Sequence, residues 1–188
     1  FKNYKTRIGA FYEGRRGKPY SWTFANDANG DGIVGNDLLY VPRGPGSGDV
    51  IFLTPADETR FWQVADENGS LGGNSGRVVE RNQAMSPWVN NIDVRFSQEI
   101  PGFNPKHKGV IALDILNFGN LLNKRWGRID EMAFQSQGGQ IRSFVNFVGI
   151  DQATGKYIYS TRTPDDFTTR QVRGESQWAL QVTLRYEF

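Results

Sequence analysis

The last twelve residues, Gln177-Trp-Ala-Leu-Gln-Val-Thr-Leu-Arg-Tyr-Glu-Phe188, decide the fold. Apolar and polar side chains alternate along this stretch with the two-residue period of a β-strand that has one apolar face. A helix would scatter the same apolar side chains around its circumference. The sequence therefore predicts a strand over about 176–188. Its apolar face consists of Trp178, Leu180, Val182, Leu184, Tyr186 and Phe188.

Three further segments alternate in the same way, over about 3–14, 88–99 and 108–118. Each has one mainly apolar set of alternate positions, such as Ile92, Val94 and Phe96 in the second segment. On the face opposite the apolar one, we expect the charged residues of each strand to face an enclosed interior. There they either contact a solute or form ion pairs between strands. These residues are Lys5, Arg7, Asp93, Arg95, Asp114, Arg185 and Glu187.

The connections between the four predicted strands are very unequal in length. A short turn over about 100–107 contains two prolines and a glycine, whereas the connections over about 15–87 and 119–175 are long. Such long loops are uncommon in compact soluble domains. Transmembrane β-barrels, however, combine short periplasmic turns with long extracellular loops. Because antiparallel strands alternate in direction, both long connections fall on the same side, so the sequence predicts an all-β fold: about four antiparallel strands of a transmembrane β-barrel with two extracellular loops. A soluble β-sandwich shows the same alternation and remains an alternative.

The two long connections also contain signals of local structure. Thr54-Pro-Ala-Asp57 is a capping box with proline at the first helical position, which predicts a short helix to about Asp66. Residues 144–150 and 156–161 flank a turn sequence and predict a β-hairpin. The aromatic residues of these connections form either a ligand surface or the packing of the loops themselves. They include Trp22, Phe61, Trp62, Trp126 and Tyr157.

Composition excludes several classes of function. The 188 residues carry a formal net charge of +2, too little to suggest a nucleic-acid-binding protein. With no cysteine and one histidine, the chain cannot form a disulfide scaffold, a thiolate zinc site or a multi-histidine metal site. We expect His107, in the predicted turn, to be solvated. No two acidic residues stand out as a catalytic pair, so the sequence does not predict an enzyme.

One motif resembles a metal-binding loop. Oxygen-bearing side chains occupy positions 1, 3 and 5 of the stretch that begins at Asp27, and a glycine occupies position 6, as in the first half of an EF-hand calcium loop. The closing ligand departs from that pattern, because position 12 is Leu38 and the nearest acid is at position 11. The motif therefore predicts either a structural calcium site or a turn chosen for its backbone preferences. The candidate calcium ligands are Asp27, Asn29, Asp31, Ile33 and Asp37.

Several segments together resemble one protein family. They are Phe11 to Trp22, Asp27 to Gly32, Gly35 to Pro42, Arg81 to Phe96, Leu113-Asp-Ile-Leu-Asn-Phe-Gly-Asn-Leu-Leu-Asn123 and the terminal strand. In order and spacing they are similar to the C-terminal barrel of TonB-dependent outer-membrane receptors of the Oar-type branch. The resemblance implies that the chain is part of a longer barrel. It also implies that a plug and a segment contacting TonB lie in a missing N-terminal part.

These observations lead to one expected function and one alternative. We expect the chain to be part of a transporter that moves a bulky solute across the outer membrane of a Gram-negative bacterium. In that setting outer-membrane lipid surrounds the strands, and the chain catalyses no reaction. The apolar face of the terminal strand, ending in Phe188, resembles the signal that the barrel assembly machinery accepts. The alternative is a secreted or cell-surface β-rich adhesion module whose Asp27–Asp37 loop binds calcium. A soluble carbohydrate-active domain is disfavoured, because an acid pair is missing.

Overall fold

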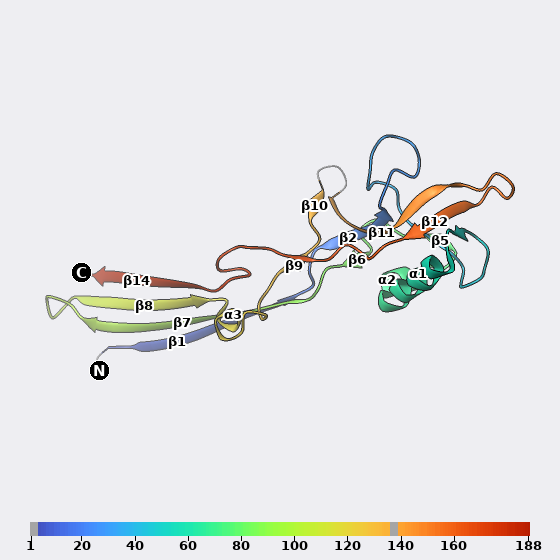
Figure 1. The fold of residues 1–188 in the computed structure, drawn as a ribbon. Coiled ribbons are helices and arrows are strands. Elements are labelled where there is room, and N and C mark those ends of the chain that lie inside the picture. The colour runs from blue at the N-terminus through green and yellow to red at the C-terminus, as the bar shows by residue number, and fades with distance from the viewer. Residues whose placement is uncertain (1–3, 136–138) are drawn as a thin grey trace. The chain divides into compact units, whose positions relative to one another are not determined.

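The structure, a computed structural model, describes residues 4–135 and 139–188. Its regular structure is mostly strand (Figure 1), which confirms the all-β prediction. Two compact units are described separately. The first comprises Phe1–Gly17, Pro87–Glu131 and Thr169–Phe188, and the second comprises Lys18–Ser86 and Met132–Thr168. Among the helices of the described residues, none combines the length and the apolar character that a membrane crossing requires.

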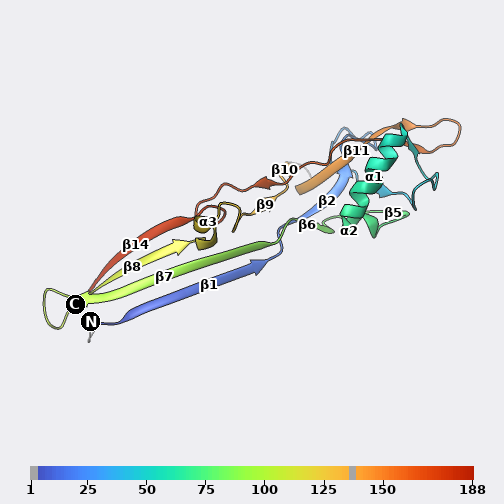
Figure 2. The ribbon, with the colours of Figure 1, turned by 60° about the horizontal axis from the view of Figure 1, so that its bottom comes forward.

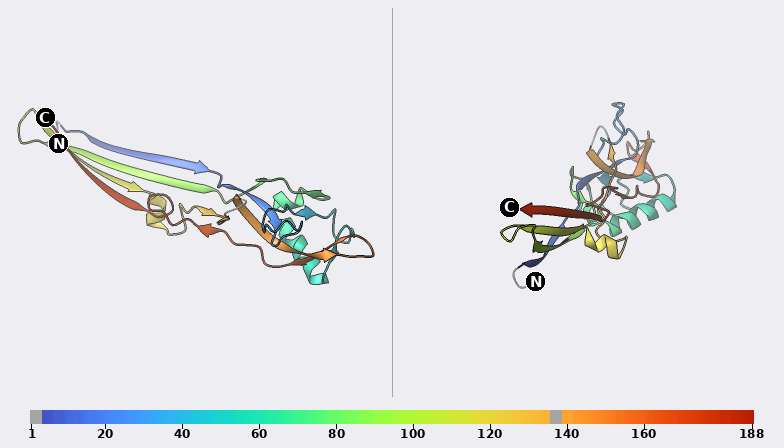
Figure 3. Two further views of the ribbon diagram at one scale, coloured as in Figure 1. Left: turned by 90° about the horizontal axis from the view of Figure 1, so that it is seen from above. Right: turned by 90° about the vertical axis from the view of Figure 1, so that its left-hand side faces the viewer.

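A four-stranded antiparallel sheet forms most of the first unit, and its strands lie side by side in Figures 1 and 2. In sheet order the strands are β1 (Thr6–Arg15), β7 (Val89–Pro101), β8 (Lys108–Leu116) and β14 (Ala179–Glu187). All four strands were predicted, and their ends lie within three residues of the predicted boundaries. Residues 102–107 form the predicted short turn, which the Gly102 N–H closes by donating to the His107 carbonyl at 3.1 Å. Figure 3 shows the C-terminus at this same end of the sheet.

The register of the four strands gathers most apolar side chains on one face and most charged ones on the other, with Phe11 and Val110 as exceptions on the charged face. Ile8 lies opposite Phe96, and Val182 lies opposite Leu113, so apolar side chains are neighbours across the strands. On the other face, Arg95 is the direct partner of Asp114. A slip of one residue would exchange the two faces of a strand. The alternation in the sequence therefore specifies the strands and the parity of their pairing, while the exact register comes from the structure.

Short elements follow the open end of β8 in the first unit. The helix α3 (Phe118–Leu122) begins directly after the strand, with Asn117 as its N-cap. The chain continues to β9 (Asp130–Glu131), which forms a two-stranded sheet with β13 (Thr168–Thr169). Beyond this pair, the Arg170 N–H donates to the Ile129 carbonyl at 2.8 Å. The segment before β14 is thereby held against the segment after α3.

The second unit is built on a mixed sheet in which strands distant in sequence are neighbours. Its main order is β4 (Ile51–Phe52), β12 (Tyr157–Thr161), β11 (Gly139–Ile150), β2 (Pro19–Phe24) and β6 (Ala84–Met85). β11 and β12 form the predicted antiparallel hairpin, whereas β2 runs parallel to β11 and β4 runs parallel to β12. In addition, β10 (Phe134–Gln135) pairs with β11, and β3 (Tyr40–Val41) pairs with β5 (Arg77–Val78).

The helix α1 (Pro55–Glu67) confirms the capping-box prediction. The Asp57 N–H donates to the Thr54 hydroxyl, and the Asp57 carboxylate accepts from the Thr54 N–H. Asp57 also accepts from the Thr161 N–H at 2.6 Å, which ties the first turn of the helix to β12. Burial by itself would raise the pKa of Asp57, but the hydrogen bonds from Thr54 and Thr161 outweigh it and hold that pKa below its ordinary value. The single turn α2 (Gly69–Gly72) follows α1.

An aromatic core fills the second unit. Trp22, Phe61, Phe144 and Tyr159 are almost completely buried, and Phe144 packs edge-on against Trp22 with 5.6 Å between ring centroids. Three of the loop aromatics, Trp22, Phe61 and the partly buried Trp62, thus serve the packing of the unit rather than a ligand surface. Trp126 and Tyr157 stay exposed.

The prediction of two separate long loops over about 15–87 and 119–175 is therefore incomplete. Residues 18–86 come from the first predicted loop and residues 132–168 from the second, and they fold together into this one unit. The two segments share a sheet through the pairing of β2 with β11 and of β4 with β12. The pairing escapes sequence analysis because it joins residues more than 100 positions apart.

Candidate functional site

One face of the four-stranded sheet is apolar and uncovered. Ile8 and Leu184 are 77% and 75% exposed, and Leu180 and Val182 in the middle of β14 are more than half exposed. An exposed apolar patch that continues across neighbouring strands marks a surface that contacts lipid or another protein. The exposed side chains of this face are Ile8, Tyr12, Ile92, Phe96, Ile111, Leu180, Val182, Leu184 and Tyr186.

The opposite face is polar and carries ion pairs between strands. Arg95 Nη1 lies 3.1 Å from Asp114 Oδ1, joining β7 to β8. On β14, Arg185 and Glu187 are paired at 3.4 Å. The sequence left two roles open for these charges, and the structure shows ion pairing between strands for Arg95 and Asp114 and, through Lys108, for Glu187, whereas Arg185 pairs within its own strand. Asp93 has another partner, since its Oδ1 accepts from the Asn117 N–H at 2.8 Å.

Glu99 connects three segments on this polar face. Its side chain is 6% exposed, and it pairs with Arg7 Nη2 at 3.2 Å and with Lys108 Nζ at 3.3 Å. It also accepts from the Lys5 N–H at 3.1 Å. Lys108 continues the network to Glu187 Oε2 at 3.2 Å. Glu99 and Lys108 were not among the predicted charges of the polar face, although the alternation along each strand could have identified them. Glu99, for example, lies at even spacing from Asp93 and Arg95 and therefore shares their face.

Both edges of this sheet are open. Among residues 4–135 and 139–188, β1 pairs with β7 alone and β14 pairs with β8 alone. The outer peptide groups of β1 and β14 can therefore accept a further strand. Phe188 is 96% exposed at the end of β14. An accessible strand edge with exposed side chains at alternate positions is what recognition by β-augmentation requires.

The predicted short turn is fastened to the terminal strand through Tyr186. The Tyr186 hydroxyl lies 2.9 Å from His107 Nδ1 and accepts from the Phe103 N–H at 3.2 Å. His107 is half-buried and stacks edge-on against the same ring. The expectation of a solvated histidine is thus only partly correct, because a tyrosine 79 residues away in sequence occupies one side of the ring.

At the other end of the strands, Asn117 organises a buried junction. It is completely buried and has a left-handed backbone with φ of 51°. Its amide nitrogen donates to the carbonyls of Gly127 and Glu175, at 2.8 and 2.7 Å. Gly127 also has a positive φ, and a Cβ at that position would overlap the Asn117 amide. One asparagine thus joins the end of β8 to the segment before β9 and to the segment before β14.

Asn120 completes the junction one turn later. Its amide nitrogen donates to the Trp126 and Lys124 carbonyls, at 2.9 and 3.2 Å, and its Oδ1 accepts from the Trp178 N–H at 3.2 Å. Both asparagines belong to a segment quoted above only for its family resemblance. Their packing role has no sequence signal of its own, because the carbonyls that they bind lie in irregular backbone.

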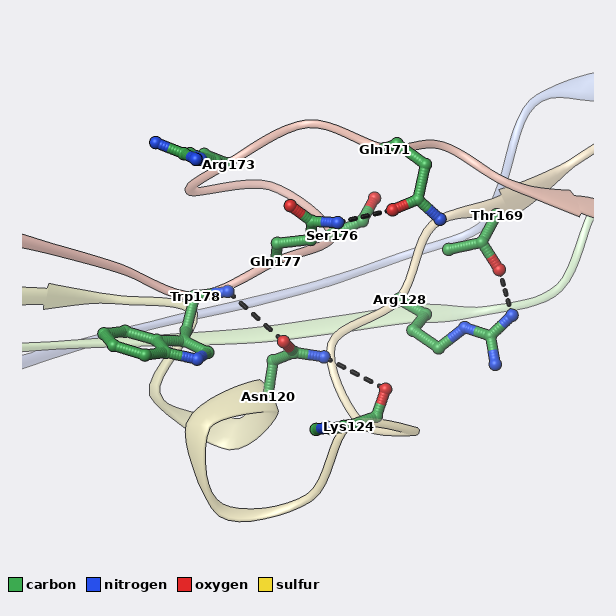
Figure 4. A pocket seen from close by; sticks show the side chains of 9 residues that line it. All are labelled: Asn120, Lys124, Arg128, Thr169, Gln171, Arg173, Ser176, Gln177 and Trp178. Atoms are coloured by element: carbon green, nitrogen blue, oxygen red, sulfur yellow. Dashed lines mark hydrogen bonds between the residues drawn. The ribbon is translucent and has the colours of Figure 1, made fainter.

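A polar cavity of about 560 Å³ lies beside this junction in the first unit. In Figure 4, Trp178 and Arg173 lie at one end of the cavity, and Arg128 and Thr169 lie at the other. Arg128 pairs with Asp130 at 3.1 Å and also contacts Thr169. Gln177 is hydrogen-bonded to Gln171 on the wall between them, as Figure 4 shows. No sequence motif connects these residues.

The candidate calcium ligands lie in one exposed loop of the second unit. Asp27 accepts from the Gly30 and Gly32 N–H groups, at 2.7 and 2.8 Å, and Asp37 accepts from the Ala28 N–H at 2.8 Å. The pKa of Asp31 is lowered, first by the hydrogen bond from the Ile33 N–H and then by those from Asn29 and Asn36. Nowhere in the described part of the chain do three or more His, Cys, Asp or Glu side chains converge on a possible metal site. Calcium binding stays a prediction.

Comparison of the chain with protein-family models, with curated proteins and with solved structures found no match. The functional proposal therefore rests on the structure of the first unit. Its features are an uncovered apolar face, an ion-paired polar face, two open edges and a polar cavity at one end of the strands.

Proposed function

We propose that this chain forms part of the wall of an outer-membrane transporter of the TonB-dependent, Oar-type class, which moves a bulky solute across the bacterial outer membrane. The observation that carries the proposal is the pair of opposite faces on one open sheet. Apolar side chains stay exposed across four strands, while the other face is polar and ion-paired. In a transmembrane barrel, lipid covers the first kind of face and the interior takes the second.

Strand length supports the same proposal. A transmembrane β-strand needs roughly 9–11 residues to cross the hydrocarbon layer. The four strands contain 10, 13, 9 and 9 residues in the order β1, β7, β8 and β14. Each strand is thus long enough to cross, while the strands of the second unit are mostly shorter.

Connectivity gives the proposed orientation. The chain leaves the sheet at the C-terminal ends of β1 and β8, and it returns at the N-terminal ends of β7 and β14. In antiparallel strands these four ends lie on the same side. Since long connections of such barrels are extracellular and short turns are periplasmic, the connections over about 15–87 and 119–175 belong outside the cell and residues 102–107 belong in the periplasm.

The open edges agree with a longer wall. Unpaired peptide groups are too costly to leave in hydrocarbon, so in the proposed setting β1 and β14 pair with other strands. The further partners implied by the family are a plug in the interior, TonB on the periplasmic side and the assembly machinery that recognises the terminal strand.

The alternative of a secreted or cell-surface adhesion module has one observation in its favour. The second unit has its own aromatic core and carries the Asp27–Asp37 loop. That alternative leaves the apolar face of the sheet in water, where such a patch promotes association.

Fractionation of a Gram-negative host that expresses the protein tests the two functions. A transporter wall is expected in the outer membrane, to need detergent for extraction, and to change its gel mobility on heating. Recovery in the soluble or secreted fraction, with no effect of heating, would refute the transporter proposal and favour the adhesion module.

A further inference from the structure

We propose that the cavity between Trp178 and Arg128 binds an anionic sugar, meaning a small saccharide that carries a phosphate or carboxylate group. The proposal concerns a binding site, so it goes beyond transport and does not depend on it. The cavity volume of about 560 Å³ lies in the range of small-molecule sites.

The charge of the lining favours an anion. Three cationic side chains, Lys124, Arg128 and Arg173, contribute to the wall, and no carboxylate does. Arg128 is already paired with Asp130. In the described part of the chain, neither Lys124 nor Arg173 forms an ion pair. Two positive charges are therefore free to bind an anionic group, and arginine in particular binds phosphate and carboxylate through two parallel hydrogen bonds.

Ser176 also contributes to the wall of the cavity. It is 2% exposed, and its Oγ is closed off from solvent and has no hydrogen-bond partner among the described residues. A ligand in the cavity therefore lies against this residue without reaching its hydroxyl.

The remaining lining suits a saccharide. Gln171 and Gln177 supply amide groups, which can both donate to and accept from sugar hydroxyls. Trp178 lines the end of the cavity and is 45% exposed, so an apolar ring lies at its rim. Cations, amides and an indole thus line one cavity. That set matches a ligand with an anionic group, several hydroxyls and an apolar ring face.

The junction described above makes the site rigid. Asn120 fixes the Trp178 backbone at one side of the cavity, and Asn117 binds the Glu175 carbonyl next to Ser176. The walls come from two chain segments, 120–128 and 169–178, which these asparagines hold together. A pocket with fixed walls loses little entropy when it binds.

Calorimetric titration of the full chain, purified in detergent, tests the proposal with glucose 6-phosphate, glucose and inorganic phosphate as probes. We expect glucose 6-phosphate to bind at least about tenfold more tightly than glucose, because one charge-assisted contact is worth that factor. Arg173→Gln and Lys124→Gln should each weaken binding about tenfold. Arg125→Gln is the matched control, since this exposed residue loses the same charge outside the cavity lining and should leave the affinity within about twofold.

Three results would overturn the site: no binding of glucose 6-phosphate, equal binding of glucose, or an equal loss of affinity in Arg125→Gln and Arg173→Gln. Circular dichroism of each variant separates lost binding from lost folding. Titration in the presence of a phosphorylated glycolipid then distinguishes two sources of the same chemistry. Displacement by the glycolipid assigns the site to a lipid headgroup, whereas undisturbed binding assigns it to a soluble saccharide.

Discussion

Arginine at position 182 probes the apolar face of the sheet directly. Val182 lies near the middle of β14, opposite Leu113, and is 59% exposed. The matched control is Gln181→Arg, on the adjacent residue of the same strand. Gln181 is also exposed but lies on the polar face, opposite Asp114. Both variants add the same charge to the same strand, and only the face differs.

The two environments predict very different costs for Val182→Arg. If lipid covers the apolar face, an arginine near the bilayer midplane destabilises the folded barrel by about 2–4 kcal/mol. That energy corresponds to a change of roughly 30- to 700-fold in the folding equilibrium. If water covers the face, a substitution at such an exposed position changes stability by no more than about 0.5 kcal/mol. Gln181→Arg should be close to neutral in both cases, because Asp114 lies across from it.

Outer-membrane fractions of cells expressing each variant provide the measurement. The heat-modifiable form is quantified on gels and normalised to total protein. We expect a loss of at least tenfold for Val182→Arg and less than twofold for Gln181→Arg. Equal recovery of the two variants would refute the lipid-facing interpretation, and a larger loss for Gln181→Arg would reverse the assignment of the faces.

Four further predictions concern other parts of the chain. Because the pKa of Asp57 is lowered in the folded protein, its carboxylate stabilises the fold above the ordinary pKa of about 4, and this stabilisation disappears as the pH falls through the lowered value. In thermal unfolding, the unmodified protein should therefore be more stable than Asp57→Asn at pH 7. This difference should shrink toward pH 3. Asn117→Ala should cost about 3 kcal/mol in denaturant unfolding, since two buried hydrogen bonds are lost and alanine is strained in the left-handed backbone conformation at this position. A cost below about 1 kcal/mol would contradict the role of the junction. Deleting Phe188 should lower the fraction of the protein that is assembled in the outer membrane. Unchanged assembly would show that Phe188 is not part of an assembly signal. Terbium should give luminescence that calcium competes away and that Asp31→Asn abolishes; without a calcium-sensitive signal, the metal prediction is wrong.

The sequence by itself determined the elements whose information is local. Alternation at every second residue specifies the four strands of the first unit and their two faces, because strand geometry alone sends neighbouring side chains to opposite sides. The capping box at Thr54 specifies the start of α1 for a similar reason, since all of its hydrogen bonds lie within one turn. The hairpin of β11 and β12 follows from a short turn between two strand-forming runs.

Only the tertiary structure decided which distant segments meet. The parallel pairing of β2 with β11 places Trp22 beside Arg142, although 119 residues separate them in the chain and neither strand encodes its partner. The junction at Asn117 and the cavity with Ser176 arise in the same way, from irregular backbone whose hydrogen bonds join segments up to 58 residues apart. Local periodicity describes how one strand divides its side chains between two faces. Local periodicity does not predict contacts between loops that are distant in the sequence, and the candidate binding site consists of such contacts.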